Sequence, residues 1–274
     1  MTHDPTGLMV DTHVHGVAED EERYPLNPSG VTGPWYREDP CSVERLLGLL
    51  DESDVGAAVL VQGMSAYRYD NRYTVDAAAR HPQRCTPVVC VDLTAPHPAA
   101  EARRLLDGGA RGLRWVAIHD GGVTEPRAVW DVVERAGVPA VMTLLAEHLP
   151  TLAGALPTLP DVPIALDHCG FADFRRGVPD ELVALAAFPN LILKVSTIAL
   201  DAAGEHGDVR ELLPELVARF GADRLCWGSD YSQTHDRLYP ELVAYARHAA
   251  SKLGDEDRSA YLGGTARTLW PELS

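Results

Sequence analysis

The sequence has few basic residues relative to acidic ones, and this imbalance limits the partners that it can bind. Its 274 residues include 40 aspartates and glutamates but only 24 lysines and arginines, which gives a formal net charge of −16. Nucleic acids and anionic membrane surfaces attract basic surfaces, not acidic ones. We therefore expect a small-molecule substrate, with no nucleic-acid or membrane partner, and we leave a homo-oligomer open.

Paired cysteines and long apolar segments are also missing. The five cysteines are scattered, odd in number and never spaced as C-x-x-C. Such a pattern indicates reduced thiols, as in the cytosol, and excludes a dense disulfide framework. No apolar run reaches the ~18 residues that would suggest a membrane-spanning helix, and no signal-peptide pattern is seen. The sequence therefore predicts a cytoplasmic protein.

Motifs for nucleotide binding and for serine-hydrolase catalysis are absent as well. No G-x-G-x-x-G turn follows the first apolar segment, and no Walker A sequence occurs. The stretch "GMSAY" (63–67) lacks the second glycine of a G-x-S-x-G nucleophile elbow. These absences argue against the usual nucleotide-binding folds and against serine-hydrolase chemistry.

What the sequence does contain is a regular alternation of short apolar segments with helical patterns. Strands are predicted at 8–13, 56–62, 85–92, 111–118, 138–145, 162–168, 191–197 and 224–230. Continuous apolar strands separated by helices are typical of a parallel sheet covered by helices. Eight such units in a chain of this length predict an α/β fold, a (β/α)8 TIM barrel formed by residues 1–274 as a single domain. A further helical pattern at about 255–269 predicts an extra C-terminal helix.

The first strand ends in a run of polar residues, "DTHVH". Side chains alternate across a strand, so we expect Asp11, His13 and His15 on one face, with Thr12 and Val14 on the other. In a barrel, the inward face at the carboxyl end of a strand lines the active site. Two histidines at this spacing can hold a divalent metal or orient a substrate carbonyl.

Two more polar residues stand at predicted strand ends. His168 ends the sixth strand in "ALDHCG", and the preceding Asp167 is expected on the opposite face. Asp230 ends the eighth strand in "LCWGSDYS", which must close the barrel beside the first strand. A carboxylate among histidines can bind a metal or act as a general base toward water. Its structural alternative is the N-cap of the next helix.

These three motifs, in this order, resemble the amidohydrolase superfamily, and more narrowly its second family, which includes decarboxylases and lactone hydrolases. The resemblance implies an active site at the C-terminal mouth of the barrel. It implies His13 and His15 as the strand-one pair, with His168 and Asp230 as their partners from strands six and eight. Metal-dependent members carry another histidine at the end of strand five, where this sequence has "MTL" (142–144). In this respect the chain resembles the lactonase branch, such as pyrone-dicarboxylate and sugar lactonases, in which some members work without metal.

Candidate substrate contacts come from several predicted loops and strands. Arg111 and Arg114 are three residues apart, so only one can point into the barrel, and the resemblance favours Arg114 as the ligand of a substrate carboxylate. Ser65 and Tyr36 could donate hydrogen bonds to a substrate, and Arg175 lies in the loop after strand six. Each of these also has an ordinary alternative, as an ion pair or a solvated loop residue.

The resulting hypothesis is hydrolysis of a lactone or related cyclic ester of a small, carboxylated metabolite. Asp230 would activate water, and His13, His15 and His168 would stabilise the developing oxyanion. With a metal, His13, His15, His168 and Asp230 would hold one zinc or manganese ion; operation without metal is the other possibility. Amide hydrolysis, decarboxylation, or ligand binding without catalysis on the same barrel are the alternatives.

Overall fold

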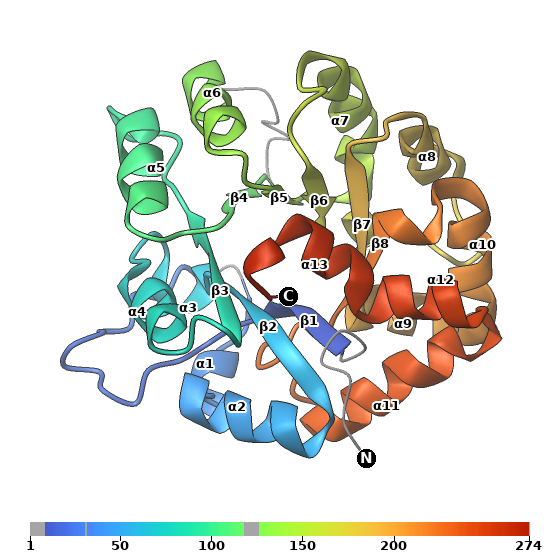
Figure 1. Ribbon diagram of the computed structural model, residues 1–274, viewed down its shortest axis with the longest axis horizontal. Coiled ribbons are helices and arrows are strands. Elements are labelled where there is room, and N and C mark those ends of the chain that lie inside the picture. The colour runs from blue at the N-terminus through green and yellow to red at the C-terminus, as the bar shows by residue number, and fades with distance from the viewer. Residues whose placement is uncertain (1–8, 31, 118–125, 274) are drawn as a thin grey trace.

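The computed structural model describes residues 9–30, 32–117 and 126–273. Its eight strands run parallel and lie side by side in chain order around one sheet (Figure 1). They are β1 (Met9–Val14), β2 (Val55–Val61), β3 (Cys85–Cys90), β4 (Leu113–Val116), β5 (Ala140–Thr143), β6 (Ile164–Leu166), β7 (Leu191–Ser196) and β8 (Leu225–Gly228). The predicted (β/α)8 barrel is confirmed. Two residues of the predicted strands, Leu8 and Ile118, lie outside the described residues.

Helices surround this sheet in Figure 1, and one of those listed next follows each strand, as the predicted alternation of strands and helices requires. They are α2 (Val43–Glu52), α4 (Arg72–Arg80), α5 (Pro98–Asp107), α6 (Arg127–Ala136), α7 (Leu149–Ala155), α8 (Asp180–Val183), α10 (Leu212–Phe220) and α11 (Tyr239–Ala249). Three short helices were not predicted: α1 (Trp35–Glu38), α3 (Met64–Tyr67) and α9 (Thr197–Gly204). All three follow carboxyl ends of strands, on the side of the predicted site.

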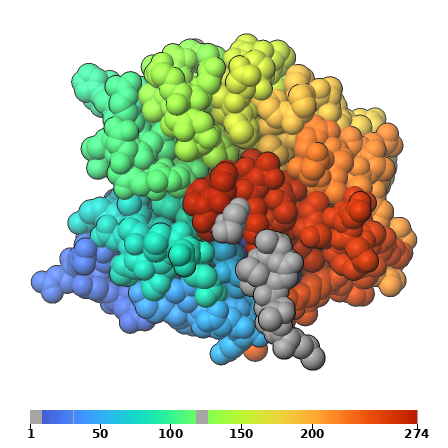
Figure 2. All heavy atoms as spheres, viewed as in Figure 1, coloured from blue at the N-terminus to red at the C-terminus, as the bar shows by residue number. Residues whose placement is uncertain are grey.

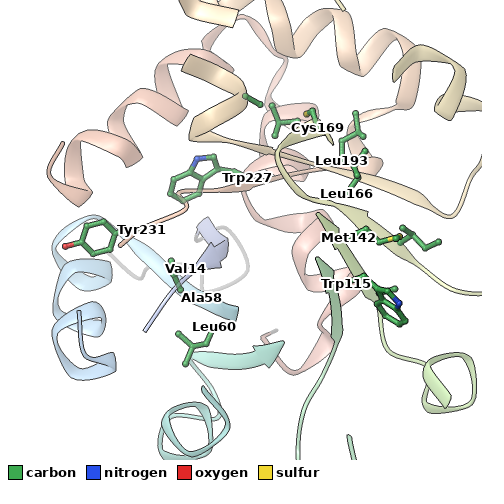
Figure 3. Packing of buried hydrophobic residues seen from close by; sticks show 14 of the residues in the cluster. Val14, Ala58, Leu60, Trp115, Met142, Leu166, Cys169, Leu193, Trp227 and Tyr231 are labelled. Carbon is green, nitrogen blue, oxygen red and sulfur yellow. The ribbon is translucent and has the colours of Figure 1, made fainter. Parts of the chain in front are cut away.

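The outer faces of the strands pack against these helices. Trp115 of β4 stacks on Trp130 of α6, with 4.3 Å between ring centroids. Met142, Leu166 and Leu193 belong to the same buried layer, as the close-up shows (Figure 3). Burying large side chains of this kind stabilises the fold by about 1.5–3 kcal/mol each. This layer explains why the strands read as continuous apolar runs.

The C-terminal segment closes one end of the barrel. It consists of α12 (Asp255–Ser259), a π-helical stretch (Ala260–Gly264) and α13 (Thr265–Leu269). Figures 1 and 2 show this red segment across the centre of the near face. A second buried cluster lies here, formed by Val10, Ala57, Val59, Val61, Val88, Val141, Ala165, Ala266, Trp270 and Leu273. The predicted extra helix is therefore confirmed, and it seals the amino-terminal end, which leaves the carboxyl end for a site.

None of the helices among the described residues is both long enough and apolar enough to cross a membrane. This agrees with the composition, in which charged residues make up 23% of the chain.

Hydrogen bonds between β1 and the segment after β8 close the barrel. The Asp230 amide donates to the His13 carbonyl at 2.8 Å, and the His15 amide donates to the Tyr231 carbonyl at 2.6 Å. The Thr12 hydroxyl donates to the Trp227 carbonyl at 2.6 Å. Because the two ends pair through these residues, Asp230 must lie beside both histidines.

The position of Asp11 corrects the prediction from strict alternation. Its carboxylate accepts hydrogen bonds from the amides of His13 (3.0 Å) and Ser229 (2.8 Å). It also accepts one from the Tyr239 hydroxyl of the outer helix α11 at 3.1 Å. Asp11 therefore faces away from the histidines, because the pairing of β1 with β2 shifts register between Asp11 and Val14. A shift of this kind breaks the two-residue period of a strand.

We expect the change Asp11→Ala to destabilise the fold without any direct change to the site. Two buried backbone N–H groups would lose their acceptor, which should reduce the free energy of unfolding by about 2–4 kcal/mol. Urea unfolding measures this change. Burial raises the pKa of Asp11 to about 6, so the control Asp11→Asn, which keeps an acceptor oxygen without a buried charge, should cost far less. Equal stability of wild type and Asp11→Ala would contradict this role.

Candidate active site at the carboxyl end of the barrel

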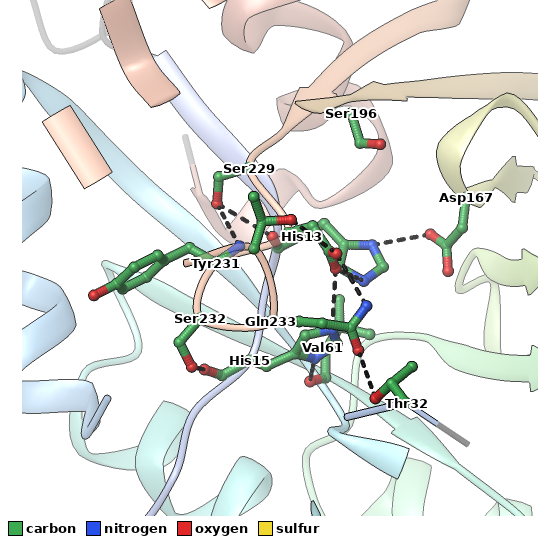
Figure 4. Close-up of polar contacts among 12 residues, drawn as sticks. His13, His15, Thr32, Val61, Asp167, Ser196, Ser229, Tyr231, Ser232 and Gln233 are labelled. Carbon is green, nitrogen blue, oxygen red and sulfur yellow. Dashed lines mark hydrogen bonds and ion pairs between the residues drawn. The ribbon is translucent and has the colours of Figure 1, made fainter. Parts of the chain in front are cut away.

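Three segments that are distant in sequence meet at the carboxyl end of the strands. His13 lies in β1 and His15 directly follows it, His168 follows β6 and Asp230 follows β8. The Asp230 Oδ1 atom lies 3.3 Å from His15 Nε2 and 3.5 Å from His13 Nε2, and the rings of His13 and His168 are 4.9 Å apart. All four side chains are buried. The predicted meeting of these residues is observed, with His13 and His15 labelled in Figure 4, and their chemical roles remain predictions.

The turn after β6 brings two neighbouring side chains into the site. Ala165 belongs to the inner core, so Asp167, two residues later, also points into the barrel. His168 then takes a left-handed conformation with φ of 54°, as do Cys169 and Phe171. The prediction that Asp167 lies on the opposite face is therefore wrong, because alternation ends with the strand at Leu166. Left-handed non-glycine residues cost on the order of 1–3 kcal/mol each and are frequent at functional sites.

Asp167 is the centre of a buried network that links four strands. Its Oδ1 accepts from Lys194 Nζ at 2.9 Å and lies 3.1 Å from His13 Nδ1. Its Oδ2 accepts from Arg114 Nε at 3.0 Å and from the Thr143 hydroxyl at 2.7 Å. Burial opposes ionisation, but Lys194, His13 and Arg114 hold the pKa of Asp167 well below its usual range. Asp167 is therefore an anion that neutralises one of two buried cations.

Each histidine of the site uses its Nδ1 atom for a contact within the protein. His15 Nδ1 lies 2.9 Å from the Val61 carbonyl, and His168 Nδ1 lies 2.7 Å from the Ser196 hydroxyl. Because a carbonyl only accepts, the Nδ1 atom of His15 carries a proton, and Nε2 is the ring nitrogen that faces Asp230. Burial lowers the pKa of His168, and burial together with Lys194 lowers that of His13 well below its usual value. Neutral imidazoles with Nε2 directed inward are suited to bind a metal.

The two carboxylate oxygens of Asp230 have different surroundings. Oδ2 accepts from Gln233 Nε2 at 3.0 Å and from the Thr234 hydroxyl at 3.3 Å. Oδ1 is buried without a hydrogen bond. Burial would raise the pKa of this carboxyl, but the neighbouring histidines His15, His168 and His13 lower it below its usual range. Asp230 is not a helix N-cap, since the next helix, α11, begins only at Tyr239.

The residues present fit a divalent metal ion. His13 Nε2 and Asp230 Oδ1 are buried without a hydrogen bond, and together with His15 they form a group whose ligand atoms all lie within 4.8 Å of one another. The two Nε2–Oδ1 separations, 3.3 and 3.5 Å, match the edge of a tetrahedron with bonds of about 2.0–2.1 Å. A second group, His13, Asp167 and His168, is also close enough. Lys194 already contacts both His13 and Asp167, so its ammonium takes the place of a second cation there.

The structure places the four predicted substrate contacts in different surroundings. Arg114 does point into the barrel, where it holds Asp167. Ser65 is buried and bonds with the Thr32 hydroxyl. Tyr36 is buried against Trp35 and lines a surface hollow that its ring shares with Glu19, Glu21 and Ser42. Arg175 is exposed and pairs with Asp173 in its own loop, so the structure does not bring it to the site.

Several residues of the site were not predicted as part of it. Thr143 occupies the place of the strand-five histidine and bonds to Asp167. Trp35 lies 5.4 Å from His15, between ring centroids. Gln233 holds Asp230. Lys194 was not predicted as part of the site either, but it gave a signal in the sequence: a lysine inside an apolar strand needs a carboxylate partner, and Asp167 is that partner.

Comparison with known proteins agrees with this geometry. The family model described as amidohydrolase matches residues 10–271. The L-fucono-1,5-lactonase of Burkholderia ambifaria is 29% identical over 241 residues, which cover 80% of this chain and 81% of that protein. The predicted resemblance to lactonase-like amidohydrolases is therefore confirmed.

Solved structures share the fold over almost the whole chain. A putative 2-pyrone-4,6-dicarboxylic acid hydrolase from Pseudomonas putida superposes with a TM-score of 0.78 at 23% identity, covering 97% of this chain and 98% of that one. An amidohydrolase from Burkholderia multivorans, solved with bound zinc, has a TM-score of 0.74 at 22% identity, covering 96% and 99%. From the family match and the lactonase relative together, we conclude that the chain is an enzyme and belongs to the amidohydrolase family.

Proposed function

We propose that this enzyme opens a lactone, or a related cyclic ester, of a small carboxylated metabolite. The observation that carries the proposal is the Asp230 carboxylate, whose Oδ1 atom is buried, has no hydrogen bond and faces two histidine Nε2 atoms. The similarity to a sugar lactonase supports ester chemistry. A barrel that only binds a ligand would not need a buried carboxylate oxygen without a hydrogen bond, because such a group is costly to bury.

His13, His15 and Asp230 would hold one divalent ion such as zinc, with His168 beside them. A bound ion of this kind would polarise the ester carbonyl and lower the pKa of a water molecule. The bound zinc of the Burkholderia multivorans amidohydrolase supports this ligand chemistry. Metal-dependent relatives would have a further histidine at the position of Thr143. The ion would therefore be held without a strand-five histidine, by His13, His15 and Asp230.

In the proposed reaction, Asp230 acts first as a base and then as an acid. Its carboxylate takes a proton from water as the water oxygen attacks the carbonyl carbon. His168, buried and neutral, would donate toward the developing oxyanion through Nε2. The bond between the carbonyl carbon and the ring oxygen then breaks, and Asp230 passes its proton to that oxygen. The product is the open hydroxy acid.

The charges around Asp167 favour a carboxylated substrate. Arg114 and Lys194 carry two positive charges against one negative charge on Asp167. At the Asp167 end of the site this local surplus would attract a substrate carboxylate despite the net charge of −16 of the chain, while the Asp230 carboxylate offsets it in the site as a whole. We propose that Arg114 faces the substrate carboxylate or carbonyl, with Ser65 nearer the rim of the site.

A panel of lactones tests the function directly. Sugar-acid lactones and carboxylated pyrones are offered to the zinc-loaded and the chelator-treated enzyme, and ring opening is followed by proton release with a pH indicator. We expect turnover of at least one lactone and preference for carboxylated ones. Carbon dioxide release from hydroxybenzoates without any lactone turnover would instead favour the decarboxylase alternative.

We expect the purified enzyme to bind about one zinc ion per chain at the His13–His15–Asp230 group. Titration calorimetry after chelator treatment measures the stoichiometry. The change His15→Ala should weaken binding by at least about a hundredfold, since it removes one of three protein ligands. His248→Ala, which removes an exposed histidine of α11, is the control. Full lactone turnover with no bound metal would support the metal-free mechanism instead.

A further inference from the structure

A chain of hydrogen bonds runs from the loop before α1 to the Asp230 carboxylate. The Trp35 indole donates to the Thr32 hydroxyl at 3.1 Å, and Thr32 donates to Gln233 Oε1 at 3.3 Å. Gln233 Nε2 donates in turn to Asp230 Oδ2 at 3.0 Å. Ser65 contacts the same Thr32 hydroxyl. Figure 4 shows Gln233 between Thr32 and the two histidines of β1.

The direction of this chain follows from the chemistry of its two ends. An indole N–H can only donate, and with the Ser65 hydroxyl also donating to Thr32, the single Thr32 proton goes to Gln233. An ionised carboxylate can only accept, so the amide group of Gln233 must turn toward Asp230. The carbonyl oxygen of Gln233 is then left for Thr32. Every donor along the chain points toward Asp230, and no other assignment of the Gln233 amide satisfies both neighbours.

This arrangement makes the two oxygens of Asp230 unequal. Oδ2 is held by Gln233 and, at the longer distance of 3.3 Å, by Thr234. Oδ1 is left without a hydrogen bond, opposite His13 and His15. A partial rotation of the carboxylate would move both oxygens and break the shorter of these bonds. The Gln233 amide therefore keeps one oxygen available for the site.

We propose that Gln233 is the positioning residue for Asp230, and that it couples the carboxylate to the segment that carries Thr32 and Trp35. The proposal rests on the proposed function and deepens it. Trp35 packs against His15 at 5.4 Å, so the same segment contacts both partners of the Asp230–His15 pair. Movement of this segment would release the carboxylate, and its docking would fix Oδ1 toward the reacting water or the metal.

Gln233 is not part of the apolar core, which separates positioning from stability. Its side chain is only partly buried, and its bonds lead to Asp230 and Thr32. The change Gln233→Leu keeps the size of the side chain and removes both bonds. We expect kcat to fall by about tenfold to a hundredfold, because one hydrogen bond to a charged group is lost. KM should change by less than about threefold. Thermal unfolding should stay within a few degrees of wild type.

Three further variants make the test specific. Thr32→Val removes only the far end of the chain, so it should also lower kcat, by a smaller factor than Gln233→Leu. The double variant should have a kcat no lower than that of Gln233→Leu alone.

Thr234→Val removes the longer bond to the same oxygen and is the matched control, with an effect on kcat of less than about threefold. Zinc affinity, measured by competition with a chromogenic chelator, should fall in Gln233→Leu and stay unchanged in Thr234→Val.

Two readouts keep this inference distinct from the proposed function. If the wild-type enzyme opens no lactone, the function fails, and a crystal structure of Gln233→Leu still tests the inference. That structure should show the Asp230 carboxylate rotated, with Oδ2 no longer in its original place. An unrotated carboxylate, or wild-type kcat and zinc affinity in Gln233→Leu, overturns the positioning role. Should Gln233→Leu fail to fold, kcat and zinc affinity of Thr32→Val decide, and wild-type values of both overturn the role.

Discussion

The change Asp230→Asn should lower kcat for lactone opening by at least about a thousandfold, in the range measured for loss of a general acid–base residue. The amide cannot take a proton from water or return one to the ring oxygen. The asparagine side chain has nearly the same size as aspartate and can largely keep the bonds to Gln233 and Thr234, so KM should change by less than about tenfold. Steady-state kinetics on the best lactone of the panel measures both constants.

Asp236→Asn is the matched control for this prediction. Asp236 lies in the same loop, six residues further on, and its exposed carboxylate contacts Arg237 rather than the site. The same substitution there should leave kcat unchanged. An Asp230→Asn enzyme that retains more than about a tenth of wild-type kcat would remove Asp230 from the mechanism, since no other carboxylate in the described part of the site has an oxygen without a hydrogen bond.

The change Asp167→Asn should destabilise the enzyme by about 3–5 kcal/mol, the cost of removing one partner from a buried ion pair. Arg114 and Lys194 would both remain buried without a counter-charge. His13 would also lose the carboxylate at its Nδ1, so activity should fall together with stability. Urea unfolding followed by circular dichroism measures the free energy of unfolding.

Lys194→Met is the comparison that makes this prediction specific. It removes one cation, yet Asp167 keeps Arg114 and Thr143 as donors. We therefore expect a smaller loss than in Asp167→Asn, on the order of 1–2 kcal/mol. If Lys194→Met proved the more destabilising change, Asp167 would not be the centre of the network.

Much of the architecture was determined by the sequence alone. The strands are apolar throughout because each is covered on the outside by helices and on the inside by other strands, so eight runs such as 56–62 and 191–197 could be counted directly. A closed parallel barrel then requires the first and last strands to be neighbours. For this reason alone His13, His15 and Asp230 could be predicted to meet.

The details of the site depend on the tertiary structure, because they arise where regular alternation ends. A register shift turns Asp11 outward to Tyr239, and a left-handed turn after β6 brings His168 inward beside Asp167. Nothing in the period of a strand predicts either event. The partners of Asp167 come from other strands, so their pairing exists only once the barrel has closed.

The role of Gln233, a loop residue, could not be predicted from the sequence either. Its neighbours in sequence carry no motif, and its partner Thr32 lies about two hundred residues away in a segment without regular structure. A loop side chain acquires its role from the surface against which it folds, and that surface is set by packing of the whole barrel. The sequence thus determined the strands and the acids and bases at their ends, while only the folded chain decided which of their atoms are held and which remain available for chemistry.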